Sequence, residues 1–415
     1  MIPAPEPSAL PVPSPLSLLK GLLWLTFTLH ILFVNAVWGG SFLATVFLVK
    51  GREKHRDVAA HLASYLPSLM AFAILFGVAP LLFVQVLYGR LFYTASILLG
   101  TPFLLSIPVL LLAYGLLYLL ERRAPEGGRA AAATAFAAFL GVGFFGFTFS
   151  NLSALLADPE RFPAKYLSHP GGFQFNLADF TVLPRFLHFF LASVALAGLY
   201  VAIRGARRLP LEPERGRWQY RSGATWFAGA TLVNGVVGAW WLLALPGEGI
   251  RSAMGGSLQG TAGLAAGLLL GAAALVLALL GMNSVRAGAL LHAAAACLLL
   301  CVFSMVLLRD AVRDALLQAA GETPPAFRPQ WGALFLFVIL LLLGGALVVY
   351  LLAVLARARR AARKAEPKLP GLSDSGVHAV SPAESGVRRL LPSDSQPIRT
   401  VSNPSSGVHR LDDEP

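Results

Sequence analysis

The stretch GLLWLTFTLHILFVNAVWGGSFLATVFLV, residues 21–49, contains no Asp, Glu, Lys or Arg and is long enough to cross a bilayer as one helix. Eight similar uncharged stretches follow it: 66–89, 91–120, 130–157, 186–203, 222–247, 252–285, 287–308 and 331–356. Backbone groups in lipid must be satisfied within their own segment, so such stretches form helices. The chain is 56% hydrophobic and 13% charged, whereas a soluble domain carries about 25% charged residues. The sequence therefore predicts an all-α, polytopic membrane helical bundle with about nine transmembrane helices.

Three regions are predicted along the chain. Residues 1–17 form a Pro-rich N-terminal segment, 18–356 a transmembrane helical domain, and 365–415 a disordered cytoplasmic tail, because Ser, Pro, Gly and charged residues dominate that tail. The predicted helices are 18–49, 65–88, 98–120, 130–156, 182–203, 224–245, 261–281, 285–308 and 331–356. The longer connections are 157–181, 204–223 and 309–330. The first of them mixes turn-forming residues with aromatics, as expected of a lid at the membrane interface.

The basic residues predict the topology. With the N-terminus outside, the inner loops and the first turns after the last helix hold 20 Lys and Arg, and the outer side holds nine. Cytoplasmic loops carry an excess of Lys and Arg, so we expect the N-terminus outside and the C-terminus in the cytoplasm, as in a multi-pass protein of a bacterial-type inner membrane. The net charge of +12 follows from these loops and does not indicate nucleic-acid binding.

Polar residues within the predicted helices are the candidates for function, because burying them in lipid is costly. Outside their terminal turns, the predicted helices contain no Asp, Glu or Lys, which removes the charged mid-membrane group that ion-coupled transporters use. Three histidines lie in helices. His30 and His188 fall in the outer half of the membrane, and His292 lies near the cytoplasmic end of its helix.

Haem b suits this pattern, because neutral imidazole is its usual axial ligand. We therefore predict His30 and His188 as iron ligands. Arg185 and Arg309 lie at a similar depth and are predicted to meet the propionates, and Met305 is a candidate thioether ligand. The alternative is that each histidine only bonds a neighbouring helix, and that Met305 only packs.

Several segments are similar to subunit I of the cytochrome bd quinol oxidases. The similarity spans roughly residues 20–205, that is, the first five predicted helices. The matching segments are Leu29-His30-Ile31-Leu32-Phe33, Phe76-Gly77-Val78-Ala79 with Phe83 and Gln85, Ser150-Asn151 with Asp158-Pro159, and Phe186-Leu187-His188. The resemblance implies that His188 ligates a low-spin haem b and that His30 ligates a second haem. It departs from the family in helix 98–120, which has no acid, and in the short connection around Glu248 and Arg251.

The favoured function is a membrane haem-b electron-transfer subunit that links the quinone pool to an outer-face redox partner, such as a cytochrome c-type subunit. Oxygen reduction by this chain alone is not expected, because helix 98–120 lacks the acids that the bd family uses. A cofactor-free scaffold subunit that recruits a cytoplasmic protein through its tail is the main alternative. A permease for a neutral or lipid substrate is a further one.

Overall fold

The computed structural model describes residues 11–284 and 286–365, and their regular elements are helices apart from one isolated bridge between Val12 and Phe327. The elements are α1 (Leu16–Lys50), α2 (Glu53–Ala63), α3 (Leu66–Leu98), α4 (Gly100–Arg123), α5 (Gly128–Leu156), η1 (Pro159–Arg161), α6 (Phe162–Ser168), α7 (Val182–Arg208), α8 (Pro213–Leu243), α9 (Gly247–Arg251), η2 (Ser252–Gly256), α10 (Leu258–Leu280), η3 (Gly281–Asn283), α11 (Ala287–Ala319) and α12 (Trp331–Ala365). Within the described ranges, nine helical spans are long and apolar enough to cross a membrane, with α2 and α3 counted as one span. The predicted multi-pass helical fold is confirmed.

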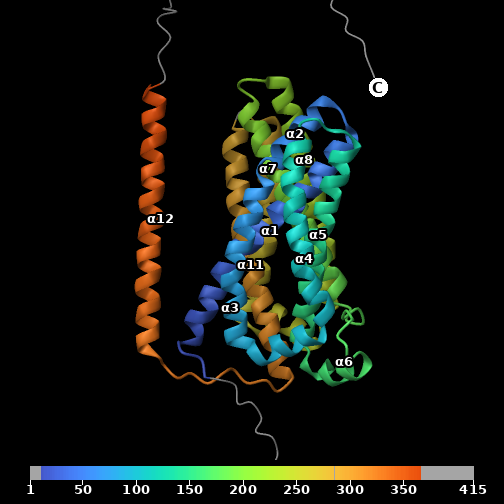
Figure 1. Ribbon diagram of the computed structural model, residues 1–415, viewed down its shortest axis with the longest axis vertical. Helices are drawn as coiled ribbons and strands as arrows, with labels where there is room; N and C mark the ends of the chain where they lie inside the picture. The colour runs from blue at the N-terminus through green and yellow to red at the C-terminus, as the bar shows by residue number, and fades with distance from the viewer. Residues whose placement is uncertain (1–10, 285, 366–415) are drawn as a thin grey trace, which may run out of the picture. The chain divides into compact units, whose positions relative to one another are not determined.

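The long helices up to α11 form one packed unit, in which they run between two ends. We call these the α6 end and the α2 end, after the short helices that lie there (Figure 1). Helix α1 begins at the α6 end, and α7 and α8 form a closely packed antiparallel pair. Helices α10 and α11 form a second pair, and α11 also packs on α1 and α7. This arrangement brings α1, α3, α7, α8 and α11 together around the predicted site.

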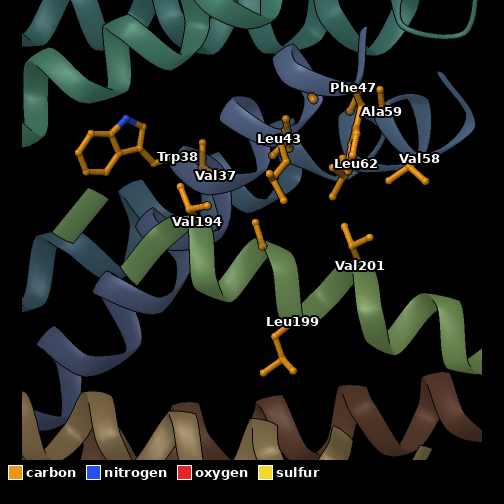
Figure 2. Close-up of a cluster of buried hydrophobic side chains, with 14 of the residues drawn as sticks. Val37, Trp38, Leu43, Phe47, Val58, Ala59, Leu62, Val194, Leu199 and Val201 are labelled. Carbon is orange, nitrogen blue, oxygen red and sulfur yellow. The ribbon is translucent and has the colours of Figure 1, made fainter. Parts of the chain in front are cut away.

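The main hydrophobic core runs through most of the long helices, and one part of it lies between α1, α2 and α7. Val37 and Phe47 of α1 and Val58 of α2 are buried. In Figure 2, Val194 and Val201 of α7 point toward the α1 side chains, whereas Leu199 points away from them. Leu199 is also buried, so α7 is covered on both sides. Burial on both sides makes α7 a rigid base for the side chains near its start.

Helix α2 was not predicted, because its sequence EKHRDVAAHLA is polar and lies in a predicted connection. One face of it is apolar and packs on the core through Val58 and Leu62. On its other face Asp57 accepts hydrogen bonds from Arg204 at 3.3 Å and Arg208 at 2.5 Å. These ion pairs also explain why α7 continues to Arg208, since its last basic residues have an acidic partner.

Helix α11 is longer than predicted. The connection expected at 309–330 is helical as far as Ala319, so Asp310 and Asp314 lie on a helix rather than in a loop. Helix α8 likewise begins at Pro213 and takes up most of the connection expected at 204–223. In both places the helix continues through charged residues, which face the bundle or its surface. A prediction from hydropathy alone places the helix boundary at the first charged residues and therefore makes the helix too short.

The segment 157–181 lies over the α6 end as a partly helical cover. Its backbone is tied to the bundle: Asn176 N donates to Asn151 Oδ1 at 2.8 Å, and Thr101 N donates to Gly172 O at 3.1 Å. Phe175 packs on Phe147 with ring centroids 5.2 Å apart. The predicted lid is thus a docked cover, and it still leaves aromatic rings such as Phe173 exposed.

The two terminal predictions fall mostly beyond the described ranges. The Pro-rich segment 1–17 is described from residue 11. There, Val12 is buried and pairs with the connection before α12: its N–H donates to Ala326 O at 2.8 Å. The tail predicted at 365–415 lies outside the described residues except for Ala365, the last residue of α12.

Candidate functional site

The ring of His30 is seated between α1 and α3. Its Nδ1 atom lies 2.9 Å from the carbonyl oxygen of Ala73. A carbonyl oxygen only accepts hydrogen bonds, so Nδ1 carries the proton and Nε2 keeps a free lone pair. Imidazoles that ligate metals are commonly held in this way, with the second ring nitrogen bonded to a carbonyl.

Gly77 of α3 makes the room for this ring. A Cβ atom at that position would lie 2.8 Å from Cε1 and 3.0 Å from Nδ1 of His30. A side chain of any kind at residue 77 would therefore push the imidazole from its place. Pro80, one turn further along α3, removes a backbone donor from the same stretch of helix.

The ring of His188 packs in a similar way between α7 and α8. Its ring lies beside the backbone of Asn234, and a Cβ at Gly238 would be 3.2 Å from its Cε1 atom. The Nδ1 atom is buried and makes no hydrogen bond within the described part of the chain. Both predicted histidines thus lie against a glycine of the neighbouring helix.

Unpaired polar atoms are concentrated where α7 meets α8. Five buried side-chain atoms there have no hydrogen-bond partner among the described residues: Arg185 Nε, His188 Nδ1, Thr231 Oγ1, Asn234 Oδ1 and Trp241 Nε1. The three α8 residues share one helix face with Gly238, at spacings of three and four. Buried polar atoms are nearly always paired in native proteins, so a group of unpaired ones calls for an explanation. A polar ligand at this interface would supply one.

The two predicted propionate partners, Arg185 and Arg309, are half-buried in the bundle. Neither makes an ion pair with any carboxylate in the described ranges, although other arginines at this end do. Arg185 lies over the Trp241 ring, 5.9 Å from its centroid, and Arg309 lies over the Phe27 ring at 4.6 Å. The two guanidinium groups are close enough to repel each other. Two neighbouring cations without an ion pair favour the binding of an anion.

Aromatic contacts connect the arginines with the histidines. Phe27 lies between Arg309 and His30, with the Phe27 and His30 ring centroids 6.3 Å apart. Arg185 lies one turn before His188 on α7. Arg309 also donates to Ser153 Oγ of α5 at 3.3 Å. Four of the five predicted site residues are therefore gathered in the half of the bundle nearer the α6 end.

Met305 is placed differently. Its terminal methyl group packs against Gly267 of α10, in a small apolar cluster with Leu308 and Trp241. This contact is ordinary helix packing, and the role of Met305 as a thioether ligand stays a prediction. His292 is exposed and lies in the second turn of α11, away from this site, where Nδ1 bonds Gly288 O at 2.6 Å.

A second polar cluster, not predicted from the sequence, lies next to this site at the α6 end. Asp310 is only 2% exposed and pairs with Arg313. Lys20 lies 3.7 Å from Asp310 and also pairs with Asp314. Arg313 donates to Tyr88 OH at 2.7 Å, and Tyr88 donates to Asp314 at 2.9 Å. The charge of Arg313 is neutralised by Asp310, whereas Arg185 and Arg309 make no ion pair in the described part of the chain and are the candidates to meet an added anion.

These residues fit a haem better than a single metal ion. Among the described residues, no three His, Cys, Asp or Glu side chains gather closely enough to hold an ion. A haem iron takes four ligands from its porphyrin and needs only one or two from the protein. A histidine with a free Nε2, a second histidine with an unpaired Nδ1, and two unpaired arginines match the iron and the propionates of such a group.

The sequence did not indicate which residues hold the rings of His30 and His188 in place. Gly77 and Gly238 carry no chemistry of their own, and only the packing of α1 on α3 and of α7 on α8 shows their role. Asn234 is visible as a polar residue in an apolar stretch. The three-residue spacing of Thr231 and Asn234 was the only signal that they share a face.

Comparison with known proteins supports the fold. No family model matches the sequence, and no curated protein matches it either. A solved structure of bd oxidase from Geobacillus thermodenitrificans matches with a TM-score of 0.64 at 13% identity, over 83% of this chain and 98% of that chain. The match extends well past the five helices in which the sequence resemblance was found. The chain therefore shares its fold with a chain of bd oxidase.

Proposed function

We propose that this protein is a haem-b-binding electron-transfer subunit of a respiratory membrane complex related to the bd oxidases. The observation that carries the proposal is the pair of half-buried arginines, Arg185 and Arg309, which make no ion pair within the described residues and lie near two histidines that each pack against a glycine. His188 and His30 would hold iron, and the arginines would neutralise propionates. A haem b, when bound, supplies one-electron transfer.

The chain's own groups have defined tasks in this proposal. The Ala73 carbonyl holds the His30 tautomer that leaves Nε2 free. The docked segment 157–181 covers the α6 end and limits the access of water to the site. The absence of acids from residues 100–120 of α4 favours electron transfer without oxygen reduction by this chain alone.

The orientation and partners belong to the same proposal. The excess of Lys and Arg at the α2 end supports a cytoplasmic location for that end, with the N-terminus outside and the protein in a bacterial-type inner membrane. The site then lies in the outer half. That depth suits exchange of electrons between membrane quinone and a redox partner at the outer face.

The test is the visible spectrum of the purified, dithionite-reduced full-length protein, together with its pyridine haemochrome yield. We expect a b-type α-band in the wild type. His188→Ala should lose one haem, and His30→Ala should lose or alter another. The matched control is His292→Ala, which removes an exposed histidine from the same bundle and should leave the spectrum unchanged.

Two results would contradict the proposal. One is a featureless spectrum from protein that is folded and was expressed with sufficient haem. The other is a haem yield that stays the same in both His30→Ala and His188→Ala.

A further inference from the structure

A pocket of about 730 Å³ lies at the α2 end, at the opposite end of the bundle from the candidate site. It lies between the end of α1, the start of α2 and about the first four turns of α8. Ten residues line it: Lys50, His55, Pro213, Glu214, Arg217, Trp218, Arg221, Ser222, Thr225 and Trp226. Those from α8 recur every three or four residues, so one face of that helix forms a wall of the pocket.

The pocket is strongly basic, and its cations are free. Lys50, Arg217 and Arg221 are exposed, and none of them makes an ion pair with a carboxylate in the described ranges. Neighbouring Arg215, by contrast, pairs with Glu53 at 2.7 Å and with Glu212 at 3.3 Å. Glu214 is the one acid among the lining residues, so the lining keeps a net positive charge.

A buried histidine gives a second, independent indication of a ligand. His55 lines the pocket, is 7% exposed and has a buried Nδ1 atom without a hydrogen-bond partner in the described part of the chain. Trp218 holds the ring edge-on, with centroids 4.9 Å apart, and the same Trp218 ring receives Lys54 at 4.8 Å. An unpaired ring nitrogen among free cations is suited to an oxyanion.

We propose that this pocket binds the phosphate headgroup of an anionic membrane lipid. Lys50, Arg217 and Arg221 surround the phosphate, and His55 and Ser222 add polar contacts. Basic pockets between transmembrane helices on the cytoplasmic side recognise anionic headgroups through this chemistry.

The depth of the pocket favours a lipid over a free anion. Arg221 is the last charged residue of α8 before its uncharged stretch 222–247. Trp226 lies one turn deeper, half-buried, and meets Phe42 edge-on at 5.9 Å. Trp is enriched at the boundary between headgroups and hydrocarbon, so the pocket crosses that boundary and its apolar end suits an acyl chain.

The experiment is a lipid titration of the full-length protein, stripped of lipid in a neutral detergent and followed by native mass spectrometry. We expect phosphatidylglycerol to bind at least tenfold more tightly than phosphatidylcholine. The double variant Arg217→Gln/Arg221→Gln should weaken phosphatidylglycerol binding by about 30-fold, from two basic contacts with an anionic headgroup. The matched control is Arg122→Gln/Arg129→Gln, which removes two exposed arginines at the same end but outside the pocket.

Further measurements test whether the variants are folded and whether the site binds a lipid or a free anion. Circular dichroism and thermal unfolding in phosphatidylcholine should agree for both double variants, and Arg221→Gln alone replaces the first variant if that one fails to fold. Equal affinities for the two lipids, or equal losses in the two double variants, would overturn the proposal. Displacement of the lipid by millimolar inorganic phosphate would show a free-anion site and would also overturn it.

Discussion

Replacing Gly77 by Ala tests whether the His30 ring is held as described. The added Cβ would lie 2.8 Å from Cε1 and 3.0 Å from Nδ1 of that ring. Carbon atoms in contact prefer a separation of about 3.5–4.0 Å, so the imidazole must retreat by about 1 Å. A shift of that size also breaks the 2.9 Å hydrogen bond from Nδ1 to the Ala73 carbonyl.

The expected cost follows from these contacts. Overpacking costs about 1–3 kcal/mol, and loss of the hydrogen bond costs about 1 kcal/mol. Ala has a higher helix propensity than Gly, and this stabilises the folded state by about 1 kcal/mol. We therefore expect Gly77→Ala to lower the free energy of unfolding by about 1–3 kcal/mol in detergent micelles. Any haem bound at His30 should be lost or spectrally altered.

The matched control is Gly89→Ala in the same helix. A Cβ there meets only Tyr93 Cε2 at 3.9 Å, an ordinary contact. This variant should be as stable as the wild type or more stable. A double-mutant cycle with His30→Ala completes the assay, because removing the ring removes the clash and Gly77→Ala should then cost nothing. Equal destabilisation by Gly77→Ala with and without His30, or by Gly77→Ala and Gly89→Ala, would refute the reasoning.

Three further predictions concern the charges. Arg309→Met should keep or raise the stability of the haem-free protein, because it removes a half-buried cation that repels Arg185, yet it should lower the pyridine haemochrome yield; an unchanged yield would exclude a propionate role. Asp310→Asn should cost about 3 kcal/mol in chemical unfolding by leaving Arg313 unneutralised, whereas Glu322→Gln, in a half-exposed pair with Arg90, should cost less than about 1 kcal/mol; similar losses would show that burial of Asp310 does not matter. Reporter fusions after residues 125 and 211 should indicate the cytoplasm and those after 165 and 324 the outside; exchanged signals at 211 and 324 would contradict the proposed orientation.

The structural match and the sequence resemblance carry different weight. At 13% identity the likeness to a bd oxidase chain concerns the fold. The function proposed for this chain rests instead on its own residues, above all on Arg185 and Arg309. A fold of this kind hosts a redox function only where ligands and counter-charges are present, and the two arginines and two histidines are the candidates for them.

The sequence by itself determined the membrane class, the nine helical spans and most of their boundaries. Lipid permits no unsatisfied backbone, so uncharged stretches such as 21–49 have to be helices whatever surrounds them. The helix boundaries predicted from the sequence were wrong where charged residues are part of a helix. Helix α2 and the last turns of α11 owe their structure to partners distant in the chain, Arg204 for Asp57 and Lys20 for Asp310.

Only the tertiary structure decided what the candidate residues meet. The sequence around His30 and His188 does not distinguish them from any other histidine in an apolar helix. Their contacts with Gly77 and Gly238 depend on how α3 and α8 pack against α1 and α7. Arg309 and Arg313 lie one turn apart, yet Arg313 is neutralised by Asp310, whereas Arg309 lies over Phe27 and makes no ion pair among the residues that the structure describes. Sequence gives the identity and depth of each group, but the pairing of charges depends on the rotation of each helix about its axis. That rotation is set by packing in three dimensions.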